Sequence, residues 1–258
     1  MVPPSPIGFE RSAIAGTTLD DLDLEALDEH LRGRAPSLAE GAPLEQLACS
    51  FGLLSGSGGR YVPTAAGLLT FGRFPQLTRP EWGIAAVRIS GLEIAAPIAA
   101  RSDLEGGLRA MLATALAFID EHARSLDGLT EPEYPGEAVR EAIVNALVHR
   151  DYRLTSRVAV RIFDDRLEVW SPGNVIAGLG VEDLVGRGGL SFARNPILTA
   201  TARGLGLVDQ IGRGLPLIRR ATEQHCGRPP KIAADPAGVQ VTIPSRVAAA
   251  APLGRPTN

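Results

Sequence analysis

The sequence predicts an α+β protein in two parts: a mixed, winged-helix-like N-terminal region and a C-terminal α/β sandwich with helices layered on a mixed sheet. At 258 residues the chain is long enough for two domains of ordinary size. Helix-type and strand-type hydrophobic patterns alternate along most of it. A stretch rich in Pro and acidic residues at 130–137 separates the two parts. We therefore expect domains at 20–130 and 131–246, between flexible tails at 1–19 and 247–258.

The N-terminal region has the element order of a winged-helix module. Leu22, Leu27 and Leu31 lie near helical spacing, and acidic residues precede arginines along the same segment, as the helix dipole favours. A glycine-rich turn then separates a second helical segment from a short β-type segment. The elements expected in this region are helices at 21–33, 44–54 and 65–71, a strand at 61–62, a strand at 83–90 and a long helix at 104–126.

The C-terminal region begins with a helix. Pro135 stands where proline favours a helix start, just before EAVREAIVNALVHR. Two β-type segments around the turn DDR predict a hairpin, and a glycine-rich loop follows them. The elements expected here are helices at 137–149, 196–202 and 214–224, and strands at 158–163, 167–172 and 239–243.

Composition excludes several classes of protein. A hydrophobic content of 45% with 21% charged residues is typical of a globular protein rather than a disordered or fibrous one. No stretch reaches the roughly 20 apolar residues of a membrane helix, and the first residues lack the pattern of a secretory signal, so we expect a cytoplasmic protein. Cys49 and Cys226 are far apart and without ligand-type neighbours, which argues against a zinc site or a disulfide framework.

Charge is distributed unevenly along the chain. The formal net charge is −3, yet the segment 194–231 holds seven basic residues against two acidic ones. Such a segment favours binding of an anion. Lys231 is the only lysine in the sequence.

The predicted helix 137–149 carries a polar stripe. Glu141, Asn145 and His149 are spaced four residues apart and therefore lie on one face, opposite the apolar positions that can face a core. A carboxylate beside a carboxamide can hold Mg²⁺ through oxygen while orienting a water molecule. A solvated helix face is the alternative interpretation of the same spacing.

Four motifs occur in a fixed order: REAIVNALVHRDY at 140–152, DDRLEVWSPG at 164–173, RNP at 194–196, which includes Asn195, and GRG at 212–214. This pattern resembles the GHKL (Bergerat-fold) ATPases, and most closely the bacterial RecG-related transcriptional regulators among them. The resemblance covers nearly all of residues 20–245. It implies a GHKL-type α/β sandwich that binds ATP and Mg²⁺, with Glu141 orienting or deprotonating the attacking water and Asn145 ligating the metal.

The resemblance also implies a phosphate site. The loop 176–190 takes the place of the family's ATP lid, and its backbone amides could cradle phosphates. Gly212 and Gly214 precede a helix, where free N–H groups and the positive dipole end favour an anion, although a simple turn is the alternative. Arg194 and Arg213 could pair with γ-phosphate oxygens, with an ion pair or solvation as the alternative for each.

The residues that would recognise adenine depart from the family pattern. GHKL enzymes carry an Asp before their first glycine, where this chain has Ser171 before Pro172 and Gly173. A hydroxyl is a weaker and less oriented acceptor than a carboxylate. Asp165, at the predicted hairpin turn, is an alternative acceptor, and ordinary turn chemistry is the competing explanation for it.

Two functions remain open from the sequence. The first is an ATP-binding regulator, with or without ATP hydrolysis, whose nucleotide state alters its association with DNA or a partner. The second is a DNA-binding transcriptional regulator, with a winged helix at 21–72 and a degenerate GHKL-like domain that has lost its nucleotide. A helicase is rejected, because the sequence has no GxxxxGK[ST] phosphate loop. A homodimer through the N-terminal helices or the arginine-rich segment 213–228 is also expected.

Overall fold

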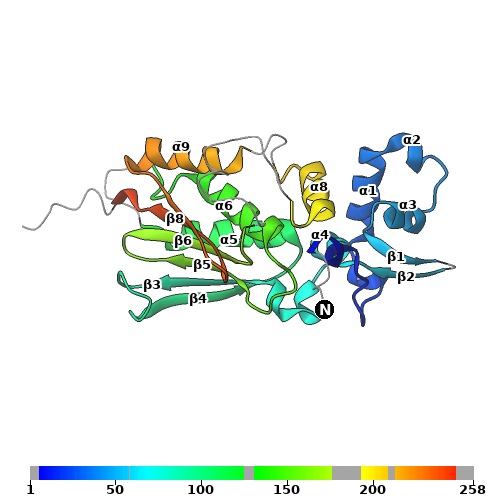
Figure 1. The fold of residues 1–258 in the computed structure, drawn as a ribbon, viewed down its shortest axis with the longest axis horizontal. Helices are drawn as coiled ribbons and strands as arrows, with labels where there is room; N and C mark the ends of the chain where they lie inside the picture. Colours follow the sequence, from blue (N-terminus) through cyan, green and yellow to red (C-terminus); the bar gives the residue numbers. More distant parts are fainter. Residues whose placement is uncertain (1–5, 58, 125–130, 176–192, 209–212, 248–258) are drawn as a thin grey trace, which may run out of the picture.

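The computed structural model describes residues 6–57, 59–124, 131–175, 193–208 and 213–247. A smaller part built mainly of helices lies beside a larger part in which a six-stranded sheet carries helices on one face (Figure 1). The predicted α+β class is confirmed. No helix in these ranges combines the length and apolar character that crossing a membrane requires.

The smaller part has the predicted order of helix, helix and wing. Asp23 caps the first helix by accepting a hydrogen bond from the backbone N–H of Ala26, and Leu27 and Leu31 of that helix are buried. The wing is a two-stranded antiparallel hairpin. Its elements are η1 (Pro6–Arg11), η2 (Leu19–Asp21), α1 (Leu24–Arg34), α2 (Pro36–Ala39), α3 (Leu44–Ser50), β1 (Leu54–Ser57), β2 (Arg60–Pro63) and α4 (Ala65–Phe71).

Residues 6–19 differ from the expected tail. Their first part forms η1, and the segment packs on the fold, with Ile14 only 1% exposed and Glu10 only 3% exposed. The Glu10 carboxylate accepts the backbone N–H groups of Ile197 and Leu198, at 2.9 Å each. These partners lie far along the chain, so local sequence patterns could not indicate them.

The large sheet has the strand order β4-β3-β5-β6-β8-β7. The pair β3–β5 is parallel, and the other neighbours in the sheet are antiparallel. The strands are β3 (Ile84–Ile89), β4 (Ile98–Leu104), β5 (Val158–Ile162), β6 (Arg166–Pro172), β7 (Lys231–Ala234) and β8 (Gly238–Pro244).

This strand order crosses the domain boundary expected at residue 130. β3 and β4 precede that position, and β3 is the direct neighbour of β5, which follows it. Hydrogen bonds between neighbouring strands make one cooperative sheet, so the division into 20–130 and 131–246 does not correspond to two separate units. Residues 131–135 instead lead directly into a helix on the same sheet, which begins at Gly136.

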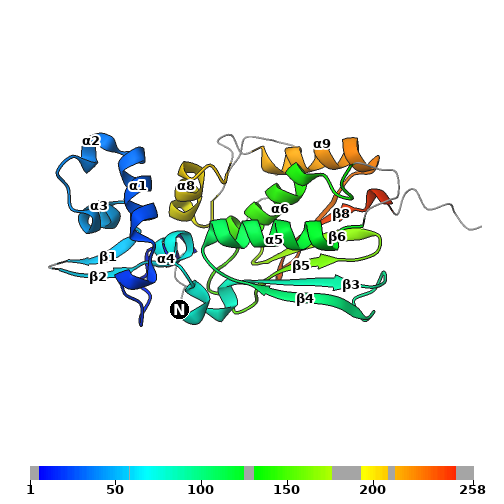
Figure 2. The same ribbon diagram turned by 180° about the vertical axis from the view of Figure 1, so that it is seen from behind.

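Three helices cover one face of the sheet, as Figures 1 and 2 show from opposite sides. They are α5 (Leu108–His122), α6 (Gly136–His149) and α9 (Gly214–Cys226). Strand residues that point toward them, such as Val160 and Leu167, are at most 1% exposed. A further helix, α8 (Pro196–Gly204), contacts α4 and η1 and so connects the sheet to the smaller part.

Three strands were not predicted from the sequence: β1, which lies where the end of a helix and a glycine-rich turn were expected, and β4 and β7 of the large sheet. β4 and β7 are the edges of the sheet, and exposed and half-buried residues alternate along most of each strand. A strand without a fully buried face lacks the alternation of apolar and polar residues on which sequence prediction depends. The helix expected at 104–126 consequently begins later, at Leu108, and β4 takes up the residues before it. Two short 3₁₀ segments, η3 (Pro75–Leu77) and η4 (Pro80–Trp82), lead into β3.

Candidate functional site

The polar stripe of α6 faces the protein rather than solvent. Glu141 is 8% exposed, and Asn145 and His149 are half-buried. The apolar side of the same helix, including Ile143 and Leu147, is buried in the core. A solvated helix face therefore does not describe Glu141.

Helix α9 covers this stripe, and it does so at a glycine. A Cβ atom added to Gly214, the first residue of α9, would lie 2.1 Å from Glu141 Oε1 and 3.0 Å from Asn145 Nδ2. A side chain at this position would overlap the Glu141 carboxylate and press closely against the Asn145 carboxamide. The absence of a side chain at residue 214 thus lets the backbone of α9 approach Glu141 and Asn145 directly.

The start of α9 is electrostatically suited to an acidic neighbour. The first N–H groups of a helix have no partner within the helix, and the dipole makes this end positive. Arg213 precedes the helix as its N-cap residue and is exposed. Gly212 lies outside the described residues, as do positions 176–190, which are expected to form the lid.

Asn195 and Ser171 anchor the C-terminal end of α6. The Asn195 side-chain amide donates to the carbonyl oxygens of Val148 and Arg150, at 2.9 Å each. The Ser171 hydroxyl donates to the carbonyl of Ala146 at 2.9 Å. Both contacts satisfy carbonyls that a helix end leaves unpaired. The lone pairs of the Ser171 oxygen remain able to accept.

Arg194 lies at the same end of α6. Its guanidinium pairs with Asp151, with 3.3 Å between Nη1 and Oδ2, and also donates to the carbonyl of Asn174. Burial and the positive charge of Arg194 lower the pKa of His149 to about 4. His149 is therefore neutral at physiological pH and can accept or donate a hydrogen bond without carrying charge.

Gly173 turns the chain sharply beside Asp151. Its φ is +102°, and a Cβ added there would lie 2.7 Å from the Cβ of Asp151. The backbone N–H of Asp151 donates to the carbonyl of Pro172 at 2.8 Å. Arg153 holds the Asp151 carboxylate at 2.6 Å and, through this bond, lowers its pKa. Ser171, Gly173, Arg194 and Asn195 are thus brought together around the end of α6.

The structural role of Arg150 and Tyr152 in this region could not be inferred from the sequence. Arg150 is fully buried, and its guanidinium donates to three carbonyl oxygens, those of Glu81, Leu154 and Ser156. It also lies over the Tyr152 ring, 4.7 Å from the ring centroid. The motif HRDY drew attention to these positions, but their structural role depends on η4 and on the segment before β5.

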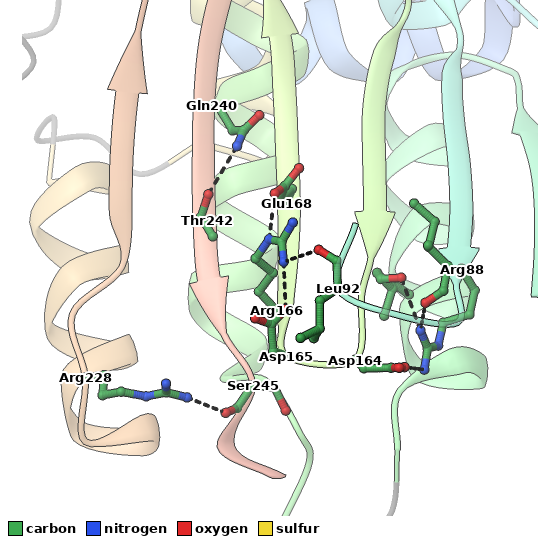
Figure 3. A network of polar contacts seen from close by, with 12 residues as sticks. Arg88, Leu92, Asp164, Asp165, Arg166, Glu168, Arg228, Gln240, Thr242 and Ser245 are labelled. Atoms are coloured by element: carbon green, nitrogen blue, oxygen red, sulfur yellow. Dashed lines mark hydrogen bonds and ion pairs between the residues drawn. The ribbon is translucent and has the colours of Figure 1, made fainter. Parts of the chain in front are cut away.

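Asp165 is separated from this group. It lies at the turn between β5 and β6, at the opposite end of β6 from Ser171, which is about 20 Å along a strand of this length. Its carboxylate pairs with Arg166 at 2.8 Å, as Figure 3 shows. Asp165 therefore belongs to a different surface.

No cluster of three or more His, Cys, Asp or Glu side chains suited to a metal ion occurs among the described residues. Oxygen donors at the α6–α9 contact come from the Glu141 carboxylate and the Asn145 carboxamide. A hard cation that also takes ligands from a bound phosphate needs few protein donors.

Comparison with known proteins extends these observations. Residues 155–243 match the family described as "Putative ATP-dependent DNA helicase recG C-terminal" (HATPase_c_4). This part of the chain is HATPase-like. The HATPase-like segment includes β5, β6, α8, α9, β7 and β8, whereas α6, with Glu141 and Asn145, precedes it.

A solved structure gives a broader likeness. The crystal structure of the DIP2311 protein from Corynebacterium diphtheriae is similar to this chain, with 27% sequence identity and a TM-score of 0.64. The similarity covers 92% of this chain and 46% of that one, so the chain spans about half the length of the protein it matches. No curated protein matches the sequence.

Proposed function

We propose that this chain binds ATP where α9 begins against the polar stripe of α6. The observation that carries the proposal is the contact of Gly214 with Glu141 and Asn145. It joins the helix that precedes the HATPase-like segment to a helix within it. A helix N-terminus approached without an intervening side chain suits the binding of phosphate groups.

Mg²⁺ is the cofactor that this site would use. The oxygen donors of Glu141 and Asn145 are the type that Mg²⁺ prefers, and both side chains lie next to the backbone at the start of α9. Asn145 would hold the ion through its carboxamide oxygen. When bound, Mg²⁺ neutralises the charge of phosphate oxygens.

If ATP is hydrolysed, Glu141 is the residue placed to assist. Its carboxylate oxygen would accept the proton of an attacking water molecule. The start of α9 would stabilise negative charge developing on the phosphate. His149, held neutral by burial and by Arg194, would contribute hydrogen bonding but no charge.

A regulatory role is proposed because the site is connected to the N-terminal part. Asn195 binds the end of α6 and is the N-cap of α8. The next residues of α8, Ile197 and Leu198, donate their backbone N–H groups to Glu10. A shift of α6 on nucleotide binding would therefore be transmitted through α8 to the N-terminal part, which would alter its affinity for a partner such as DNA.

The alternative is a DNA-binding regulator with a degenerate domain. Ser171, at the position where the resembling family has an Asp, supports it. Helix α3 of the winged-helix-like part does not favour DNA binding, because it contains Glu45 and no Lys or Arg. The experiment below separates the two functions.

The test is calorimetric titration of the full chain with a non-hydrolysable ATP analogue, with saturating Mg²⁺ and without it. Asn145→Ala should weaken binding by about 10-fold or more and reduce its dependence on Mg²⁺. Glu141→Ala should leave affinity nearly unchanged and lower turnover by about 10²–10⁴-fold. Glu137→Ala is the matched control, because Glu137 is an exposed glutamate one turn earlier on α6.

Two outcomes contradict the proposal. Equal affinity of the wild type and Asn145→Ala, at both Mg²⁺ concentrations, would remove the nucleotide site from α6. If Glu141 only stabilises the start of α9, Glu141→Ala would cost about 1 kcal/mol of folding free energy and leave turnover unchanged.

A further inference from the structure

A second polar site lies past the other end of α9. The segment after this helix, with Arg228 and Lys231, faces the turn between β5 and β6 and the last residues of β8 across an open pocket of about 370 Å³. Asp165, Arg166 and Thr242 also line the pocket. α9 has 13 residues, so about 20 Å separate this pocket from Gly214.

Asp165, which lines the pocket, and Glu168, which lies beside it, are both paired with arginine. Arg166 pairs with Asp165 at 2.8 Å and with Glu168 at 2.7 Å, and it also donates to the carbonyl of Leu92 (Figure 3). Arg161 lies 3.7 Å from Glu168 on its other side. Two carboxylates are therefore balanced by two guanidinium groups.

Arg228 and Lys231, the other two cations of the pocket, have no acidic partner among the residues that the structure describes. Arg228 donates through Nη2 to the carbonyl oxygen of Ser245 at 2.9 Å, which fixes the guanidinium without neutralising it. Lys231 makes no side-chain hydrogen bond or ion pair within the described ranges. Two positive charges are thus left facing the same pocket.

Thr242 adds a neutral donor. Lys231 and Thr242 are directly opposite in the β7–β8 pair, so their side chains lie on the same face of the sheet. The Thr242 oxygen accepts a hydrogen bond from the Gln240 amide at 3.3 Å, which leaves its own proton free to be donated (Figure 3).

We propose that Arg228, Lys231 and Thr242 form a binding site for a phosphate monoester. Two uncompensated cations match the dianion, and three donors from different segments match a tetrahedral group with three free oxygens better than a planar carboxylate. The pocket is larger than a phosphate alone, so the ligand is a small phosphorylated molecule. This site is independent of the proposed nucleotide site.

The single lysine makes the test direct. Reductive ¹³C-methylation of the full chain labels Lys231 and the terminal amine and keeps the lysine charge, and Lys231→Arg assigns the signal. The labelled protein is titrated with glycerol phosphate, inorganic phosphate and acetate, each against sodium chloride at equal ionic strength. Glycerol phosphate and inorganic phosphate should each give a saturable shift of the Lys231 methyl signal, and acetate should bind at least about 10-fold more weakly.

Variants locate the binding. Arg228→Gln should weaken phosphate binding by about 10-fold or more, whereas Arg219→Gln, which removes an exposed arginine of α9, should not. Asn145→Ala should leave the phosphate titration unchanged. The proposed phosphate site and the proposed nucleotide site are therefore tested independently. A linear shift equal to that of chloride, equal binding of acetate, or no effect of Arg228→Gln would overturn the proposal.

Discussion

Helix α9 begins against a buried carboxylate and a half-buried carboxamide, and it ends beside an open pocket lined by the cations Arg228 and Lys231. Both ends carry a glycine, yet for different reasons. Gly214 has no room for a side chain, because Glu141 and Asn145 occupy that space. Gly227 has nothing within 4 Å but adopts a φ of +65°, which other residues reach only with strain.

Glycine therefore occurs at the two ends of α9 under two different structural constraints. A glycine whose side-chain space is occupied by functional groups belongs to a site, because its substitution moves those groups. A glycine that is required for its left-handed backbone conformation ends a helix, and its substitution changes stability alone. Gly214→Ala and Gly227→Ala test this distinction, and His149→Gln and Arg219→Gln probe the surroundings of α9.

Gly214→Ala should have the largest effect. The added Cβ displaces the Glu141 carboxylate, and a misplacement of about 1 Å can lower a rate by about 10²-fold. Stability should change less than turnover, because the atom that must move is the end of the flexible Glu141 side chain. Steady-state ATP hydrolysis together with thermal unfolding measures both effects. Normal turnover in the variant would show that the contact has no catalytic consequence.

His149→Gln tests whether the α6 end of the site is dry. The pKa of His149 falls from an ordinary 6.5 to about 4 on folding. Between these values the unfolded chain binds the proton that the folded chain does not, so stability is full above about pH 6.5 and falls as the pH approaches 4.

Between pH 8 and pH 5, the free energy of unfolding should therefore fall by about 1–2 kcal/mol less in the variant than in the wild type, as measured by urea unfolding. His225→Gln serves as the control, because that histidine is near the other end of α9 and outside the α6 site. If the free energy of unfolding depended on pH in the same way in the wild type and in His149→Gln, the lowered pKa of His149 would be contradicted.

Gly227→Ala should cost about 1 kcal/mol of folding free energy through the left-handed conformation alone. ATP affinity and turnover should match the wild type. Chemical denaturation and the nucleotide titration check the two statements. A change in nucleotide affinity would mean that the two ends of α9 are not functionally separate.

Arg219→Gln should have the smallest effect. Arg219 pairs with Glu223 at 2.9 Å on the outer surface of α9, and both side chains are largely exposed. Exposed pairs one turn apart contribute about 0.3–0.5 kcal/mol, so the unfolding midpoint should barely move. A loss above about 1 kcal/mol would show that this face of α9 is covered by something else.

Much of the fold could be predicted from sequence patterns. The helices around Leu68 and Ile143 lie where the patterns placed them, because each buries a continuous apolar stripe. η1 could not be predicted, since the burial of Glu10 depends on α8 at the other end of the chain. The domain boundary failed for a similar reason, because strand pairing across it is invisible to local periodicity.

The candidate site was predictable only in part. Helical spacing placed Glu141 and Asn145 on one face, which the structure retains. That Gly214 lies against them depends on how α9 packs on α6, which no pattern within either helix encodes. Asp165 illustrates the converse, since a residue near a motif in the sequence lies at the far end of a strand in space.

The parallel pair β3–β5 has a consequence for how the chain is made. During synthesis β3 emerges long before β5, so its hydrogen-bonding edge can be completed only after α5 and α6 have also emerged. Conversely, a fragment that begins at residue 155 carries the whole HATPase-like segment yet lacks β3 and α6. Val158, Val160 and Ile162 would then lie on an uncovered edge strand, and such a fragment should aggregate rather than fold.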